Sequence, residues 1–195
     1  MDITWQGSTS FTIKGQSATV AIDPASVDPK TQVVLSSKPP ETIPETARLF
    51  DWPGEYETKD IPINGFSAFT KPKKEDGTSE GERTVIFRFS VDGITICHLG
   101  ELGHTLSNEQ IERIGNIDVL MIKIGEGSNL DKKKALEIIE SIEPRIVIPM
   151  GSADMTSALS TMGIQAPVAE PKLTIKSASS LQTDDMKYVL LEGTS

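Results

Sequence analysis

The chain of 195 residues is poor in the residue types that cross-link proteins and hold transition metals. Its single cysteine excludes an internal disulfide and suits a reducing compartment. It has two histidines, at positions 98 and 104, so a site built from several imidazoles is out of reach. No apolar run approaches the ~20 residues of a membrane span, and the N-terminus lacks the pattern of a signal peptide. We therefore expect a cytoplasmic protein.

Positive charge is also scarce in this sequence. The chain has 19 Lys and Arg against 28 Asp and Glu, which gives a net charge of −9. Binding to a nucleic-acid backbone depends on clustered basic residues, so this balance argues against such a partner. Hydrophobic residues make up 37% of the chain, enough for a sizeable core. The length fits one domain over residues 1–195.

The first half of the sequence has the patterns of β-strands. Alternating or short apolar runs predict strands at 2–6, 10–14, 17–23, 31–37 and 60–69. The segment 70–83 is charged and rich in glycine, which predicts an exposed loop. Two further apolar runs flank Asp92–Gly93, and Asp-Gly between such runs indicates a hairpin.

The second half alternates strands with helices. Ser107 and Gln110 form a capping-box pattern that predicts a short helix to about Ile114. Asp131 can cap a second helix over 132–142, between apolar strands at 117–124 and 145–150. A helix ending at Gly163 and two closing strands, at 172–177 and 187–192, complete the expected order. Strands first and a strand–helix–strand unit later predict an α/β layered sandwich.

Five segments occur in the order in which one branch of the metallo-β-lactamase superfamily has them. They are ITWQGSTSFTIKG, VAIDP, DWPGEYETKDIPINGFSA, DGITICHLGELGHTLSNEQIERIGNIDVLMIKIGEG and PRIVIPMG, within residues 2–151. The chain resembles this branch of small hydrolase-like proteins. The resemblance implies an α/β fold of the family's kind, a four-layer αββα sandwich.

The same resemblance implies a site for one or two metal ions, usually zinc, and assigns its ligands to positions of this chain. The family's H-x-H-x-D-H segment aligns with residues 37–42. Ser37, Pro39 and Thr42 stand where its histidines would be, and Glu41 stands where its aspartate would be. No histidine exists before residue 97, so a shift of the alignment cannot restore one.

Two further ligand positions lie in the second half of the chain. Glu101 matches the aspartate of the family's HLGDLGH segment, and Gly151 matches the histidine that ends IPMH. Other residues match positions that support the fold: Asp23 matches an aspartate behind the site, and Gly100 and Gly103 match backbone positions. The resemblance therefore predicts a scaffold without its histidine ligands.

The remaining candidates have structural interpretations of their own. We expect His98 to be hydrogen-bonded beside the core, His104 to orient its loop, and Cys97 to be a small buried residue. Glu101 is the best surviving metal-ligand type, and the simplest expectation is that its carboxylate accepts bonds from nearby backbone amides.

We therefore predict a non-catalytic relative, a pseudoenzyme, with no cofactor and with a binding or assembly role. Its partner would be a small molecule or a protein, and a homo-oligomer stays open. The alternative is a metal-dependent hydrolase with a rebuilt, carboxylate-rich site. Asp23, Glu41, Glu101 and His104 would then hold a divalent metal such as Zn²⁺, Mn²⁺ or Mg²⁺. A third interpretation is a structural subunit that pairs through the edges of its sheets.

Overall fold

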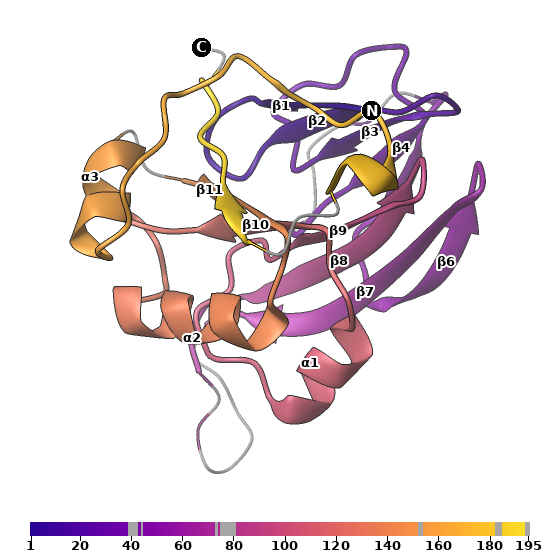
Figure 1. Ribbon diagram of the computed structural model, residues 1–195. Coiled ribbons are helices and arrows are strands. Elements are labelled where there is room, and N and C mark those ends of the chain that lie inside the picture. The colour runs from indigo at the N-terminus through magenta and orange to yellow at the C-terminus, as the bar shows by residue number, and fades with distance from the viewer. Residues whose placement is uncertain are drawn as a thin grey trace.

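Two β-sheets face each other in the computed structural model, and the helices α1 and α2 lie against the outer face of one of them (Figure 1). The structure describes residues 1–38, 43, 45–72, 74, 81–151, 154–181 and 185–193. Apolar side chains from the two inner faces form a common core. Among the described residues, no helix is long and apolar enough to cross a membrane.

The first sheet has the strand order β12-β1-β2-β3-β4-β5. Its strands are β1 (Asp2–Trp5), β2 (Phe11–Lys14), β3 (Thr19–Ile22), β4 (Val33–Leu35), β5 (Arg48–Phe50) and β12 (Leu173–Thr174). The pairs from β12 to β3 are antiparallel, whereas β3, β4 and β5 run parallel. In β1 and β2 every second residue is buried, as the alternating pattern predicts for strands with one face on the core.

The second sheet has the order β13-β11-β10-β9-β8-β7-β6. Its strands are β6 (Gly54–Thr58), β7 (Ile61–Phe69), β8 (Arg83–Val91), β9 (Ile94–His98), β10 (Val119–Lys123), β11 (Ile146–Met150) and β13 (Lys187–Tyr188). From β6 to β9 the pairs are antiparallel, and from β9 to β13 they are parallel. Asp92 and Gly93 have φ of 53° and 76°, so the predicted tight hairpin between β8 and β9 is confirmed.

Three helices follow the second set of strands. They are α1 (Asn108–Ile114), α2 (Lys132–Ile142) and α3 (Met155–Thr161), and a 3₁₀ turn covers Ala178–Leu181. Both bonds of the capping box between Ser107 and Gln110 are present. The Asp131 carboxylate accepts the Lys134 amide at the start of α2. The predicted caps are therefore confirmed.

Two strands, β5 and β6, go beyond the strands expected from the apolar patterns. The sequence does not predict β5, because its three residues stand among polar residues and prolines. Within the predicted loop at 70–83, residues 73 and 75–80 lie outside the described residues. The layered α/β class itself is confirmed. Because β3, β4 and β5 run parallel, and β9, β10 and β11 do too, their carboxyl ends can bring side chains together at one edge of the sandwich.

Candidate functional site

Four of the positions that the sequence singles out lie at or shortly after the ends of parallel strands. Asp23 follows β3, Ser37 lies just after β4, Glu101 lies after β9, and Gly151 follows β11. The two sheets touch here, since the Val85 amide of β8 donates to the Ser37 carbonyl at 3.2 Å. We call this region the strand-end edge.

Asp23 is fully engaged with Ser37. One carboxylate oxygen accepts the Ser37 backbone amide at 2.5 Å, and the other accepts the Ser37 hydroxyl at 2.6 Å. Asp23 itself has a left-handed backbone, with φ of 43°, and Ser37 is buried. Ser37, which aligns with the first expected histidine, is thus bonded to Asp23, which aligns with the expected supporting aspartate.

The backbone before Glu101 packs tightly against Ser37 and β8. A Cβ atom added to Gly100, whose φ is +57°, would lie 2.8 Å from both the Ser37 Cβ and the Thr84 hydroxyl oxygen. The Glu101 amide donates to that hydroxyl at 3.2 Å. A glycine is therefore required at position 100, both for its φ and for the close approach. This packing fixes the direction in which the Glu101 side chain leaves the chain.

The Glu101 carboxylate is paired with Lys123, the last residue of β10. The Lys123 ammonium donates to both carboxylate oxygens, at 2.9 and 2.7 Å. The Asn129 amide also donates to the Glu101 carboxylate, at 3.3 Å. The two charged side chains are only 13% and 20% exposed. The expected partners of Glu101 were backbone amides, and that expectation is wrong: its partners are an ammonium and a side-chain amide.

Lys123 also fills the space beside Gly151. A Cβ atom at Gly151 would overlap Lys123 Cγ and lie 2.9 Å from its Cε, and Gly151 has φ of +101°. A side chain at position 151 and the present course of Lys123 are therefore mutually exclusive. Sequence reasoning missed Lys123. One signal could have indicated it: Lys123 is the charged residue that ends an apolar strand, and that strand pairs with the strand before Gly151.

His98 connects the two sheets and is completely buried. Its Nδ1 accepts the Gly100 amide at 3.2 Å, so Nε2 carries the proton and donates to the Thr9 carbonyl at 2.9 Å. The ring meets Phe11 edge-on, with centroids 6.0 Å apart. Burial lowers the pKa of His98, although the carboxylate of Asp23 acts in the opposite direction. A neutral imidazole with both nitrogens in use agrees with the expected structural role.

His104 has both ring nitrogens in use as well. Its Nε2 accepts the Phe69 amide at 3.3 Å, and its Nδ1 donates to the Thr105 carbonyl at 2.8 Å. The ring thereby holds the segment before α1 against the end of β7, as expected of a loop-orienting residue. Cys97 is buried on the opposite face of β9 from His98, and burial raises the pKa of its thiol to about 12.

Comparison with known proteins places the chain in a family. Residues 2–151 match the family model described as the beta-lactamase superfamily domain. The chain belongs to this superfamily. The resemblance to the metallo-β-lactamase superfamily and the predicted layered fold are therefore confirmed.

Its relatives bear the names of metal-dependent hydrolases. A candidate Zn-dependent hydrolase of the metallo-β-lactamase superfamily from Thermotoga maritima is 26% identical, with 99% of each chain covered and a TM-score of 0.75. A metal-dependent hydrolase from Pelotomaculum thermopropionicum is 33% identical over 79 residues, which is 38% of this chain and only 35% of that relative. A candidate metal-dependent hydrolase from Parabacteroides distasonis shares the fold, with 14% identity, coverage of 85% and 90%, and a TM-score of 0.60.

The described side chains at the strand-end edge do not fit a metal ion as they stand. Within the described ranges, no three His, Cys, Asp or Glu side chains gather as ion ligands. The proposed rebuilt set is therefore not assembled from Asp23, Glu101 and His104. Its fourth member, Glu41, lies outside the described residues, as do Pro39 and Thr42. Asp23 and Glu101 already accept bonds from a serine and an ammonium.

Proposed function

We propose that this protein is a non-catalytic member of its superfamily whose role is binding or assembly. One observation supports this most directly: the ammonium of Lys123 donates to both oxygens of Glu101, the carboxylate matched to a metal ligand. The pair satisfies the negative charge of Glu101 internally. In this proposal the ammonium of Lys123 takes the place of a metal ion beside Glu101.

Electrostatics and space both support the proposal. Two like unit charges ~4 Å apart repel by about 4 kcal/mol near a protein surface, and a divalent ion beside an ammonium would be repelled more strongly. A histidine at position 151 would also meet the stem of Lys123. An ion could enter only if Lys123 moved away and left Glu101 to the ion. The 13% exposure of the Lys123 side chain argues against such easy release.

A metal-dependent hydrolase is the second candidate function. It is favoured by the full-length similarity to the candidate Zn-dependent hydrolase of Thermotoga maritima. Asp23 and Glu101 would be the described carboxylates available to such a site, which would need ligands from elsewhere. In that case the chemistry supplied by the ion would be activation of a water molecule.

Metal content distinguishes the two functions. Protein purified without chelator, incubated with Zn²⁺ or Mn²⁺ and desalted, should hold far less than one ion per chain. Lys123→Met, which removes the charge and keeps most of the stem, tests whether the ammonium excludes the ion. Lys133→Met is the matched control, because the Lys133 side chain is 85% exposed on α2. One or two tightly held ions in the wild type, lost in Glu101→Ala, would contradict the proposal.

Activity and assembly need separate measurements. Phosphodiesterase, lactamase and lactonase assays with added Zn²⁺ or Mn²⁺ should stay at the level of a no-protein control. Metal-dependent turnover that disappears in Glu101→Ala would support the hydrolase instead. Light scattering at several protein concentrations would test the assembly role. A constant monomer mass would contradict assembly and leave ligand binding as the proposed role.

A further inference from the structure

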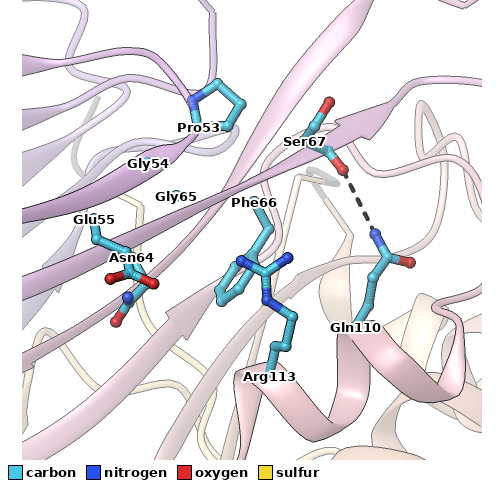
Figure 2. Close-up of a pocket in the computed structure, with 9 residues that line it drawn as sticks. All are labelled: Pro53, Gly54, Glu55, Asn64, Gly65, Phe66, Ser67, Gln110 and Arg113. Carbon is cyan, nitrogen blue, oxygen red and sulfur yellow. Dashed lines mark hydrogen bonds between the residues drawn. The ribbon is translucent and has the colours of Figure 1, made fainter.

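A cavity of about 330 Å³ lies away from the strand-end edge, on the outer face of the second sheet. It is bounded by β6 and β7 on one side and by α1 on the other, as Figure 2 shows. Gln110 of α1 reaches across it and donates to the Ser67 carbonyl at 3.5 Å. Ser67 and Gln110 also line a second cavity of about 440 Å³. We call the first cavity the outer groove. Its size falls in the range of small-molecule sites.

Arg113 presents an unused positive charge in the outer groove. Its guanidinium lies over the ring of Phe66, with 5.3 Å between Cζ and the ring centroid (Figure 2). Phe66 is only 7% exposed, so the ring is a fixed platform. Among the described residues, Arg113 has no hydrogen-bond acceptor and no ion-pair partner. This contact orients the guanidinium but leaves its N–H donors for another group.

A second arginine faces the same side of the sheet, and one of its nitrogens has no hydrogen-bond partner among the described residues. Arg88 of β8 lies directly opposite Asn64 of β7, which lines the outer groove. Side chains directly opposite in neighbouring strands project to the same face, with Cβ atoms ~5 Å apart. The Arg88 Nε is buried and has no hydrogen-bond partner in the described part of the chain. Leaving a buried donor of a charged group unpaired is strongly unfavourable, so an acceptor supplied by a ligand would stabilise this nitrogen.

Within the part of the chain that the structure describes, these two arginines have no carboxylate partner, although the sequence has 28 acidic and 19 basic residues. The register explains why the nearest acid does not serve. Glu55 lies opposite Asn64 on β6, so Asn64 separates it from Arg88 by a whole strand. Glu55 lines the groove at the Asn64 end. Its charge disfavours a doubly charged anion and leaves a singly charged one acceptable.

We propose that the outer groove binds a small carboxylate with an aromatic or other planar apolar part. The carboxylate would accept bonds from Arg113, the planar part would pack beside Phe66 and Pro53, and Arg88 would be a nearby second positive charge outside the lining. Asn64 and Gln110 supply further donors. This site goes beyond the proposed binding role, because it names a place and a ligand class and does not depend on the state of the strand-end edge.

The test uses the full chain and probes of defined chemistry. Benzoate and indole-3-acetate are titrated into ¹⁵N-labelled protein at mildly alkaline pH. Benzamide is the uncharged match, and inorganic phosphate, largely a dianion above neutral pH, is the doubly charged one. Both carboxylates should give saturable shifts at Phe66, Gln110 and Arg113, and at least tenfold weaker binding is expected with benzamide. Arg113→Gln should weaken carboxylate binding at least tenfold, whereas Arg48→Gln, an exposed arginine on the other sheet, should not.

Four results would overturn the proposal. The first three are the absence of saturable binding by either carboxylate, equal binding of benzamide, and unchanged affinity in Arg113→Gln. The fourth is preferred binding of phosphate, because the ligand class would then be wrong. Arg88→Gln is the second variant, and it should weaken carboxylate binding less than Arg113→Gln does, because Arg88 lies outside the lining. Unchanged affinity in Arg88→Gln would contradict the role given to Arg88. Thermal unfolding confirms that each variant is folded, so a loss of binding can be assigned to the groove.

Discussion

The ion pair of Lys123 and Glu101 neutralises the charge of Glu101 at the strand-end edge. Both are largely withdrawn from water, so their attraction is weakened less by solvent than that of a surface pair. Because both side chains are removed from water, either charge would be unfavourable if its partner were absent. The pair should therefore be strongly coupled, and its members should respond differently to single and joint replacement.

A double-mutant cycle measures this coupling. Lys123→Met and Glu101→Gln should each lower the free energy of unfolding by about 1–3 kcal/mol, because each leaves a largely buried polar partner unsatisfied. The double variant should lose less than the sum of the two. Urea unfolding of the four proteins gives the coupling energy. Strict additivity would show that the ion pair does not act as a unit.

His98 predicts a pH dependence with a definite sign. Its pKa is lowered by burial in the folded chain, whereas the unfolded value is about 6.5. The unfolded chain therefore binds more protons as the pH falls below about 6.5, and stability declines with a slope of at most ~1.4 kcal/mol per pH unit. Urea unfolding at pH 7.5, 6.5 and 5.5 tests this. Imidazole NMR should show His98 still neutral at the lowest pH, and titration near 6.5 in the folded protein would contradict the assignment.

At the level of single elements, the short helix α1 depends on its first turn. Ser107 accepts the Gln110 amide while Gln110 reaches back to the Ser107 amide. Ser107→Ala removes one of these bonds and should lower the free energy of unfolding by about 1 kcal/mol. Ser141→Ala, within α2, is the control: its hydroxyl bonds the Glu137 carbonyl of its own helix, so the change should be close to neutral. Equal losses in both variants would contradict the capping argument.

Elements with local signals could be predicted from sequence, and those that depend on distant partners could not. The α1 cap and the Asp92–Gly93 hairpin each follow from a few adjacent residues. The strand β5 has three residues, and it is a strand because β4 lies beside it. The pairing of Glu101 with Lys123 spans 22 positions and was likewise invisible. The positions of the edge residues followed from the family resemblance, but their bonding partners required the fold.

At the scale of the whole molecule, one late segment completes both sheets. β12 pairs with β1 in the first sheet, and β13 pairs with β11 in the second. The first of these contacts is reinforced by Lys172, whose ammonium donates to Asp2 at 2.7 Å. The Met1 ammonium donates to the Ile175 carbonyl at 3.0 Å. This segment therefore covers strands that would otherwise be open edges.

Removing residues 171–195 should expose both edges at once. Open strand edges pair with other chains, so the shortened protein should unfold at lower urea concentration and should self-associate. Light scattering and urea unfolding measure the two effects. Lys172→Ala is the control, because it removes only the ion pair with Asp2. The Lys172 side chain is half-exposed, so this loss should be small. A monomeric shortened chain with an unchanged urea midpoint would contradict this role.

The pairing of Asp2 with Thr174 also has a consequence during synthesis. At roughly 5–20 residues per second, a nascent β1 waits on the order of ten seconds for its outer partner to be translated. Throughout that interval its outer backbone groups are open to other nascent chains. Asp2 places a charge on this temporary edge, the kind of residue that discourages unwanted strand pairing. The carboxylate that later receives Lys172 can thus protect the chain before Lys172 exists.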